Sequence, residues 1–183
     1  MDMVVDVSPI KEQKGASLRV DGVSPCPHLE VEGGAVEGCS PVRVRGQVTR
    51  TGKGYLVELH LTTRVRLECT RCLAPFVLLL ERDVQEMFYP EALRGQVSEE
   101  GDVVSYFSGD TLDLSEPIRE NLQLALPMKR LCREACRGLC PVCGQNRNEG
   151  DCGCRPQLVD PRWSALARWL AAAQQSGPDG KER

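Results

Sequence analysis

Residues 42–67 read VRVRGQVTRTGKGYLVELHLTTRVRL, and this stretch decides the fold. Valine and leucine alternate with polar residues on both sides of the turn Thr51-Gly52-Lys53-Gly54. Successive side chains of a strand point to opposite faces, so the alternation predicts half-buried strands joined by a hairpin. We therefore expect an antiparallel sheet with one buried face and one face in water.

The flanking sequence extends this sheet. Residues 1–40 are rich in Gly, Pro and Glu and predict an edge strand and loops. The nearly continuous apolar run 76–81 predicts a more buried strand. Residues 83–89 and 102–107 are expected to add to the sheet, and the acidic segment 90–102 is expected to be a mobile loop.

A helix is predicted over residues 113–126. Asp113 and Glu116 have the spacing of a capping box, which favours a helix start. Pro127 is expected to end the helix. Apolar residues at helical spacing predict one buried face, made of Leu114, Ile118, Leu122 and Ala125.

A second helix is predicted near the end of the chain. Asp160 is expected at its N-cap, Pro161 at the first helical position and Gly177 after its end. Residues 177–183 are expected to be disordered. The predicted buried face consists of Trp163, Leu166, Ala167 and Leu170.

The composition excludes several classes of protein. The chain has 183 residues, of which 41% are hydrophobic and 4% aromatic, so Leu, Val and Ala must form the core. It has no apolar stretch near the roughly 18 residues of a membrane span and no basic and apolar secretory signal, so we expect a cytoplasmic protein with no membrane partner. The net charge of −3 does not mark a nucleic-acid binder. Charge is segregated, however: residues 43–82 hold eight basic and three acidic residues, and residues 83–120 hold two and ten.

Ten cysteines are the unusual feature of the composition. In a reducing cytoplasm, dense cysteine indicates metal binding before disulfides. Two local pairs are expected to form one Cys₄ site and two distant pairs a second, so one or two Zn²⁺ ions are predicted. The local site would use Cys140, Cys143, Cys152 and Cys154, and the distant site Cys69, Cys72, Cys132 and Cys136.

The ligand partition leaves one alternative open. Cys136 could replace Cys152 or Cys154, because adjacent ligands of a C-x-C pair can strain one site. Cys26 and Cys39 match no pair and are expected to be buried or free thiols.

A catalytic role finds little support in the sequence. Cys69 and Cys72 could form a redox pair, but a strand-like segment follows them where a thioredoxin-like context needs a helix. The two histidines, His28 and His60, belong to no metal-binding or catalytic motif. We therefore expect no enzyme activity and no small-molecule substrate.

Arginines share strand faces within the basic region. Arg43 and Arg45 are two residues apart, as are Arg64 and Arg66, so each pair lies on one face of a strand. If the two strands are neighbours in matching register, the four guanidinium groups form one patch. Together with Arg71 they are candidate contacts to RNA phosphates. Alternatively, basic residues near the cysteines offset the charge of metal-bound thiolates.

Several motifs occur in a fixed order along the chain. They are Cys69-Thr70-Arg71-Cys72-Leu73, Leu124-Ala125-Leu126-Pro127, CRGLCPVCG at 136–144, Asn146, Asn148, Cys152-Gly153-Cys154 and Asp160-Pro161-Arg162. This set resembles the YceD-like family from roughly residue 40 to the end of the last helix, with a departure at Arg147, where an apolar residue is expected. Members are described as large-ribosomal-subunit rRNA accumulation proteins, so the resemblance implies a cytoplasmic bacterial factor, or an organellar relative, that supports 23S rRNA processing or stability. It implies no catalytic residue. Because members can lack the later cysteines, it also implies that a zinc ion in 140–154 serves stability more than function.

The predicted fold class is α+β, with a mainly antiparallel sheet or partly open barrel, a mid-chain helix, a Cys-rich zinc loop and a C-terminal helix. The expected domains are a β-rich domain over 1–127 and a zinc loop over 128–176 with the last helix packed on it. The predicted function is non-enzymatic ribosome biogenesis by binding rRNA or the pre-ribosomal large subunit. The alternatives are a redox-sensitive zinc chaperone or thiol sensor, and an adaptor whose acidic segment 83–120 binds basic ribosomal proteins.

Overall fold

The computed structural model describes residues 3–31, 34–36, 38–96, 104–154 and 161–175. The chain divides into two compact units, residues 1–136 and 137–183, which are described separately below. The predicted N-cap at Asp160, the expected end at Gly177 and the predicted tail lie outside the described residues.

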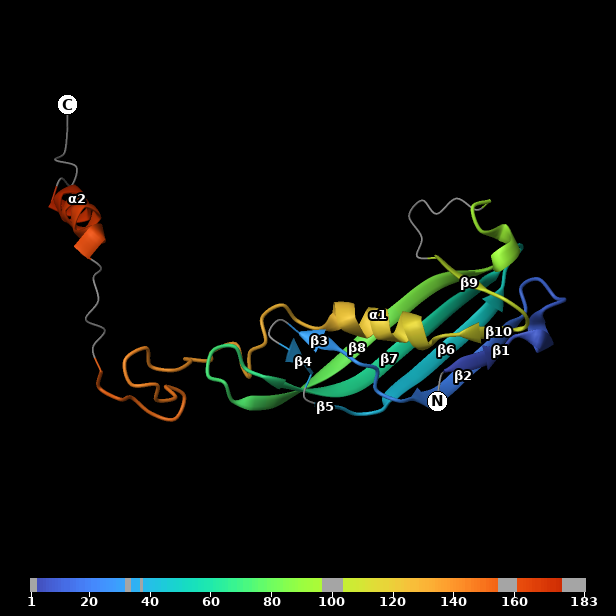
Figure 1. The fold of residues 1–183 in the computed structure, drawn as a ribbon, viewed down its shortest axis with the longest axis horizontal. Coiled ribbons are helices and arrows are strands. Elements are labelled where there is room, and N and C mark those ends of the chain that lie inside the picture. Colours follow the sequence, from blue (N-terminus) through green and yellow to red (C-terminus); the bar gives the residue numbers. More distant parts are fainter. Residues whose placement is uncertain (1–2, 32–33, 37, 97–103, 155–160, 176–183) are drawn as a thin grey trace, which may run out of the picture. The chain divides into compact units, whose positions relative to one another are not determined.

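Strands make up most of the first unit (Figure 1). Two short 3₁₀ turns accompany them at Ser8–Ile10 and Glu91–Leu93. The strands and the helix are β1 (Val4–Asp6), β2 (Ser17–Ser24), β3 (Glu30–Val31), β4 (Gly34–Ala35), β5 (Gly38–Cys39), β6 (Val42–Arg50), β7 (Tyr55–Glu68), β8 (Pro75–Pro90), β9 (Val104–Phe107), β10 (Thr111–Asp113) and α1 (Ser115–Ala125).

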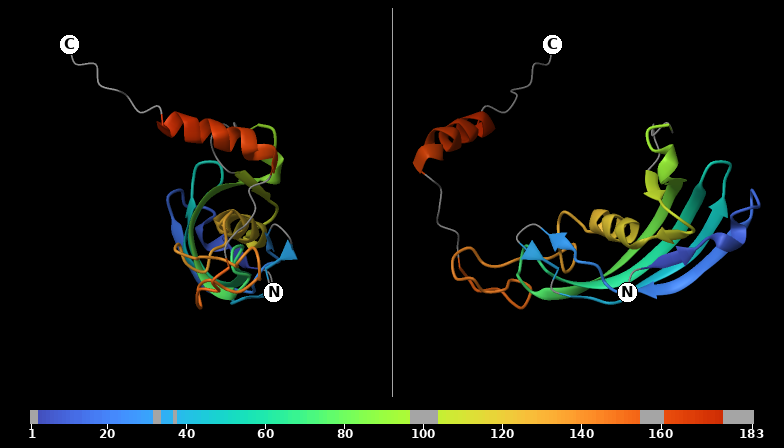
Figure 2. Two further views of the ribbon diagram at one scale, coloured as in Figure 1. Left: turned by 90° about the vertical axis from the view of Figure 1, so that its left-hand side faces the viewer. Right: turned by 45° about the vertical axis from the view of Figure 1, so that its right-hand side comes forward.

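The main sheet has six strands in the order β2-β6-β7-β8-β9, with β5 also pairing with β7. All of its pairs are antiparallel except β8 with β9, which is parallel. The sheet is curved but not closed (Figure 2). The predicted α+β class with a mainly antiparallel, partly open sheet is therefore confirmed.

The helix α1 lies on the concave side of the curved sheet (Figure 2). This side is the inner face of the sheet, and the opposite side is its outer face. Every second residue of β7 from Tyr55 to Leu67 points inward and is buried. Apart from Thr63, these side chains share one core with Ile118 and Leu122 of α1, as the helical spacing predicted. The residues between them on β7 point to the outer face.

Among the described residues of the first unit, no helix covers the outer face of the sheet. The predicted burial of residues 76–81 is therefore wrong for the side chains on that face. The run 76–81 was expected to be a more buried strand, but it belongs to β8, whose outer side chains Val77 and Leu79 are 60% and 51% exposed. The strand formed by residues 76–81 therefore contacts the core through its inner face only. The sequence also understated β2, which forms an eight-residue strand along β6.

At Gly46 the backbone of β7 leaves no room for a side chain on β6. A Cβ atom at this position would lie 1.9 Å from the carbonyl oxygen of Glu58. Only glycine fits such a contact, and a glycine inside a strand allows a sharp bend. A larger residue at this position would therefore push β6 and β7 apart.

The start of α1 differs in detail from the predicted capping box. The carboxylate of Asp113 accepts a hydrogen bond from the backbone N–H of Ser115 at 2.9 Å, and Leu114 is the N-cap residue. Glu116 forms an ion pair with Arg119 on the next turn. The helix therefore begins where predicted, but the assignment of Asp113 as N-cap and of Glu116 as its capping-box partner is wrong.

The second unit contains a cysteine-rich loop and the helix α2 (Ser164–Gln175), preceded by a 3₁₀ turn at Pro161–Trp163. Trp163, Leu166 and Leu170, which were predicted to be buried, are 61%, 47% and 48% exposed. The structure thus corrects this assignment for these three residues. Neither described α-helix combines the length and the apolar character needed to cross a bilayer.

Candidate functional site

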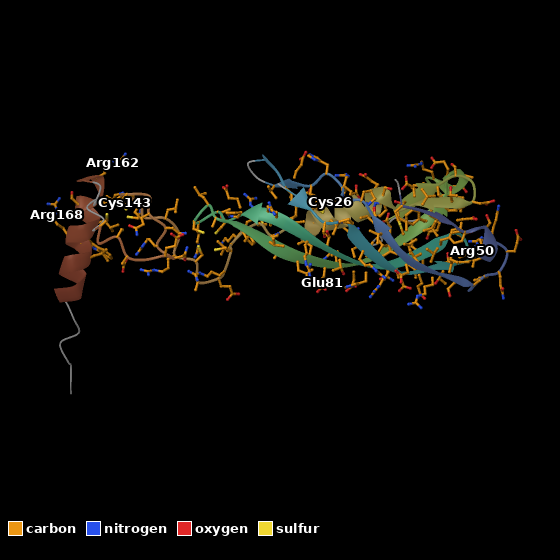
Figure 3. All side chains as sticks on the ribbon, turned by 90° about the horizontal axis from the view of Figure 1, so that it is seen from below. Cys26, Arg50, Glu81, Cys143, Arg162 and Arg168 are labelled. Atoms are coloured by element: carbon orange, nitrogen blue, oxygen red, sulfur yellow. A yellow bond between two sulfur atoms is a disulfide. The ribbon has the colours of Figure 1, made fainter. Side chains whose placement is uncertain are left out.

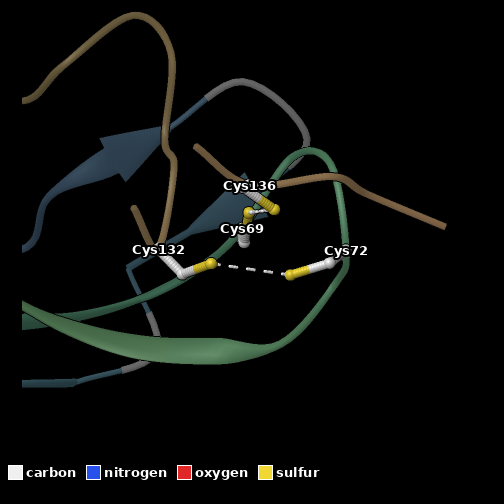
Figure 4. A group of neighbouring side chains, drawn as sticks. All are labelled: Cys69, Cys72, Cys132 and Cys136. Carbon is white, nitrogen blue, oxygen red and sulfur yellow. Dashed lines mark hydrogen bonds between the residues drawn. The ribbon is translucent and has the colours of Figure 1, made fainter. Parts of the chain in front are cut away.

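The first cysteine cluster, Cys69, Cys72, Cys132 and Cys136, lies where the turn between β7 and β8 meets the segment after α1 (Figure 4). The sulfur atoms of Cys69 and Cys136 are 3.8 Å apart, and those of Cys72 and Cys132 are 3.7 Å apart. Cys69, Cys72 and Cys136 are buried. The backbone N–H of Thr70 also donates to the carbonyl oxygen of Arg130 at 2.8 Å, which fastens the two segments together.

The second cluster, Cys140, Cys143, Cys152 and Cys154, lies entirely within the second unit. Its ligand atoms are all within 4.8 Å of one another, as they are in the first cluster. Cys140 is buried, whereas Cys143 and Cys154 are exposed. The structure thus groups the eight cysteines as their spacing predicted, and Cys136 joins the first cluster rather than replacing Cys152 or Cys154.

Both clusters are built on the same backbone turn. In the first, the N–H of Leu73 donates to the carbonyl oxygen of Cys69, and the N–H of Cys69 donates to that of Ala74. In the second, Gly144 donates to Cys140 and Cys140 to Gln145 in the same pattern. The residue after the second cysteine has a positive φ in each turn, 58° at Leu73 and 75° at Gly144.

Each cluster contains one thiol with a lowered pKa and another with a raised one. Burial acts to raise the pKa of Cys69, but backbone N–H groups, that of Cys132 foremost, lower it to about 6. Burial and the neighbouring thiols raise the pKa of Cys132 to about 12. In the second cluster the backbone N–H of Cys143 leads in lowering the pKa of Cys140 to about 6, and neighbouring thiols raise that of Cys154 to about 12. Each cluster therefore favours one thiolate at neutral pH and opposes a further negative charge, which a divalent cation would offset.

The donor set and spacing fit a tetrahedral metal ion. With Zn–S bonds of about 2.3 Å, tetrahedral geometry places sulfur atoms about 3.8 Å apart. Two sulfur pairs of the first cluster match this value, Cys69 with Cys136 and Cys72 with Cys132. Four sulfur donors leave no open coordination position, which is typical of a structural site. Both clusters could hold a metal ion.

Cys26 and Cys39 form a disulfide, which corrects the prediction that they are buried or free thiols. Their Cα atoms lie 5.8 Å apart, within the range that a disulfide spans. The pairing of β5 with β7 brings Cys39 into the sheet, and Cys26 follows the end of β2. The sequence could not reveal this, because the two residues share no motif and meet only through the sheet.

The outer face gathers the predicted arginines, as the register of β6 and β7 shows. Arg43 lies opposite Thr62 and Arg45 opposite His60, so Arg64 is the diagonal neighbour of Arg43. Figure 3 shows the side chains from below and labels Glu81 of β8, which belongs to this face, and Arg50 at the hairpin end of the sheet. The strands are neighbours, but only Arg64 adjoins the β6 pair, since Arg66 lies beyond the end of β6 and opposite Gly38 of β5.

These arginines differ in the groups around them. Arg43 forms an ion pair with Asp21 of β2 at 2.9 Å. Arg71 donates to the carbonyl oxygen of Cys136 at 3.0 Å and so supports the first cluster. Arg64 and Arg66 are exposed, and neither has an ion pair among the described residues. Their cross-strand neighbours on β8 are Leu79 and Val77, which carry no charge.

A buried carboxyl group on the inner face was missed at the sequence level. Glu86 of β8 is 4% exposed and accepts a hydrogen bond from the hydroxyl of Ser105. Burial raises the pKa of Glu86, while the hydrogen bond from Ser105 opposes this shift. Alternation along β8 would have placed residue 86 inward had its register with β7 been known.

Comparisons with known proteins point to a single family. A family model described as large ribosomal RNA subunit accumulation protein YceD matches residues 57–169. An uncharacterized protein of Mycobacterium tuberculosis is 31% identical over 170 residues, which cover 92% of this chain and 81% of that protein. The uncharacterized protein YlbN of Bacillus subtilis is 27% identical over 138 residues, with coverage of 75% and 78%. The chloroplastic large ribosomal RNA subunit accumulation protein YCED homolog 1 of Arabidopsis thaliana is 27% identical over 165 residues, with coverage of 74% and 50%. No solved structure matches the chain.

Proposed function

Because the chain belongs to the YceD family, we propose that it is a non-enzymatic factor that supports accumulation of large-subunit rRNA by binding that RNA in the cytoplasm. The family description and the name of the Arabidopsis relative both refer to large ribosomal RNA. Binding would protect the RNA or assist its processing within the pre-ribosomal large subunit. Ribosomal proteins of the same particle are further candidate partners.

The observation that carries this proposal is the pair Arg64 and Arg66 on the outer face. Both side chains are exposed, and both lie beside uncharged neighbours on β8. Neither guanidinium group forms an ion pair with a described residue, so both are free to contact phosphates, which form a large part of RNA affinity. Glu81, the diagonal neighbour of Arg64, and Glu68, two residues after Arg66, lie on the same face and reduce the net positive charge of the patch. Arg45 and Arg43 extend the patch along β6, although Asp21 offsets the charge of Arg43.

We further propose that the two cysteine clusters bind Zn²⁺. The ion would supply structural cross-linking, because four thiolates fill its coordination shell. In the first cluster it would hold the β7–β8 turn, and with it the end of β7 that carries Arg64 and Arg66. A Cys₄ zinc site has a net charge of about −2, so Arg71 beside the first cluster serves in part to balance it.

The test of RNA binding is a double charge reversal, Arg64→Glu with Arg66→Glu, measured by filter binding to purified large-subunit rRNA. We expect affinity to fall at least tenfold at low salt. The slope of log K against log salt should shrink by about 1.5, since each lost phosphate contact removes roughly 0.7–0.9. The matched control is Lys14→Glu with Lys53→Glu, the same charge change at exposed positions away from the patch, which should alter affinity much less. An unchanged affinity and salt slope in the arginine variant contradicts the proposal.

A second candidate function is a thiol sensor, favoured by the exposure of Cys143 and Cys154. Exposed thiolates are open to oxidation, and loss of the metal would disorder the loop that it holds. In that case dilute peroxide should eject one metal ion and switch on suppression of aggregation of a heat-denatured reporter enzyme. A protein that keeps its metal and stays inactive in this assay is not a sensor.

A further inference from the structure

An open hollow of about 880 Å³ lies on the outer face over β2, β6, β7 and β8. Its volume falls in the range of about 300–1,000 Å³ that is typical of small-molecule sites. The hollow lies on the same face of β7 as Arg64. Arg64 is four residues beyond His60, which lines the hollow, and is therefore about 13 Å from His60 along the strand. Its charged side chains are those of Arg19, Arg45, Glu58 and Asp83, and His60, Gln47 and Gln85 add further hydrogen-bonding groups.

The register of the sheet arranges these groups in two rows. Gln47, Glu58 and Gln85 are direct cross-strand neighbours on β6, β7 and β8. Arg45 and His60 form the next row together with Asp83, whose pairing position on β8 is opposite His60. Direct neighbours have Cβ atoms about 5 Å apart, so the polar ends of each row can reach a single planar ligand.

Hydrogen bonds hold parts of both rows in place. His60 Nδ1 and Asp83 Oδ1 are 2.7 Å apart, which fixes the imidazole ring. The amide of Gln47 donates to Glu58 Oε2 at 2.9 Å, which orients that carboxylate. Such support keeps the groups ordered before a ligand arrives, so that less conformational entropy is lost on binding.

The mixture of charges distinguishes the hollow from the Arg64 and Arg66 patch. A chain of phosphates alone would be repelled by Glu58 and Asp83. A nucleobase, in contrast, presents hydrogen-bond donors and acceptors together and is recognised on these edges when it is unpaired. Guanine is the base with two adjacent N–H donors, N1 and N2, that one carboxylate can accept, and its O6 accepts from an amide or guanidinium.

We infer that the hollow binds one unpaired guanine nucleotide of the RNA. Glu58 accepts from N1–H and N2–H of the base, and its cross-strand neighbour Gln85 donates to O6. The fixed imidazole of His60 offers a stacking surface, and Arg45 contacts the phosphate of the same nucleotide. This inference rests on the proposed RNA binding and adds base selectivity to it.

The test measures the binding of fluorescein-labelled RNA heptamers by anisotropy. The heptamers consist of uridines except at the central position, which is guanosine, adenosine, cytidine or uridine. The guanosine heptamer should bind about tenfold more tightly than the other three. Equal affinities, or no heptamer binding by a protein that still binds rRNA, overturn the inference.

Two variants connect this preference to the hollow. Glu58→Gln should abolish the preference for guanosine, because an amide cannot accept from both N–H groups. Glu81→Gln makes the same charge change on the outer face beyond the hollow and should keep it. If Glu58→Gln fails to fold by circular dichroism, Gln85→Ala provides the test and should reduce the preference at least threefold. A preference that survives in a folded Glu58→Gln or Gln85→Ala variant overturns the inference.

Failure of the underlying proposal has a different signature. If RNA binding itself is wrongly assigned, Arg64→Glu with Arg66→Glu leaves rRNA affinity unchanged. If only the guanine site is wrong, that variant loses rRNA affinity while the four heptamers bind the unmodified protein equally.

Discussion

The first cluster joins cysteines up to 67 positions apart in the chain, whereas the second gathers its four within residues 140–154. Both use the same hydrogen-bonded turn after a C-x₂-C pair. They differ in burial, since three cysteines of the first are buried and only Cys140 of the second is. A metal ion in the first would thus stabilise the tertiary fold of the sheet domain, and one in the second would order a local loop.

The largest difference between the clusters should appear when one ligand of each is removed. Cys69→Ser should lower the free energy of unfolding of the first unit by on the order of 10 kcal/mol, because a structural zinc contributes about that much in small metal-dependent modules. Cys143→Ser should change it by less than about 1 kcal/mol, since the second cluster belongs to the other unit. Urea unfolding followed by far-ultraviolet circular dichroism reports the sheet. Equal losses of unfolding free energy in the two variants would contradict the different roles assigned to the two clusters.

The two clusters should also differ in how fast their thiols react with an alkylating reagent. In the metal-loaded protein, Cys143 and Cys154 are expected to react with iodoacetamide at least tenfold faster than Cys69 and Cys136, because the latter are buried. Time-resolved peptide mass spectrometry measures the order of labelling. Labelling of the first cluster before the second contradicts the assignment of roles.

The residue after each C-x₂-C pair can be replaced by the residue found at the same position of the other cluster. Gly144→Leu should weaken metal binding of the second cluster about tenfold, since a left-handed conformation costs a side chain about 1–2 kcal/mol. Leu73→Gly should change the first cluster less than threefold, because the relief of the same strain is offset by the entropy of glycine. Competition with a chromophoric chelator gives both affinities. The equivalence of the two turns is wrong if both substitutions weaken binding equally.

The smallest expected effect is a pH dependence that belongs to the sheet and not to either cluster. Glu86 has a raised pKa in the folded state, so its protonated form favours folding and its stabilising contribution is lost as pH rises through the folded pKa. Glu86→Gln should therefore raise stability at pH 7 by about 1 kcal/mol and by less at pH 4.5. Glu81→Gln, on the outer face, should change stability by less than about 0.5 kcal/mol at both values. Urea midpoints at the two pH values decide this, and a larger gain for Glu86→Gln at pH 4.5 contradicts it.

Local patterns in the sequence were sufficient for β6, β7 and α1 and for the grouping of the cysteines. Alternation predicts β6 and β7 because one face of each is buried, and C-x₂-C spacing identifies both metal-type turns. The patterns misread β8, because a run of apolar residues does not tell whether one face or two are covered. Only the position of α1 decides that question.

Features that depend on contacts across the sheet could not be predicted. The disulfide of Cys26 and Cys39, the burial of Glu86 and the parallel pairing of β9 each join segments without a shared local signal. The rows that line the hollow arise from register alone, since Glu58 and Gln85 are 27 positions apart in the chain and opposite each other in the sheet. Arg64 and Arg66 were recognisable as a pair, but the absence of carboxylates opposite them on β8 was not.

Native mass spectrometry of the reduced protein, purified without chelators, tests most directly whether two metal ions order this molecule. The account predicts a chain that carries two zinc ions, with Cys143→Ser carrying one and keeping the folded charge-state distribution. It also predicts that Cys69→Ser loses one ion and shifts to the high charge states of an unfolded chain. A metal-free chain that retains the folded distribution would contradict the account.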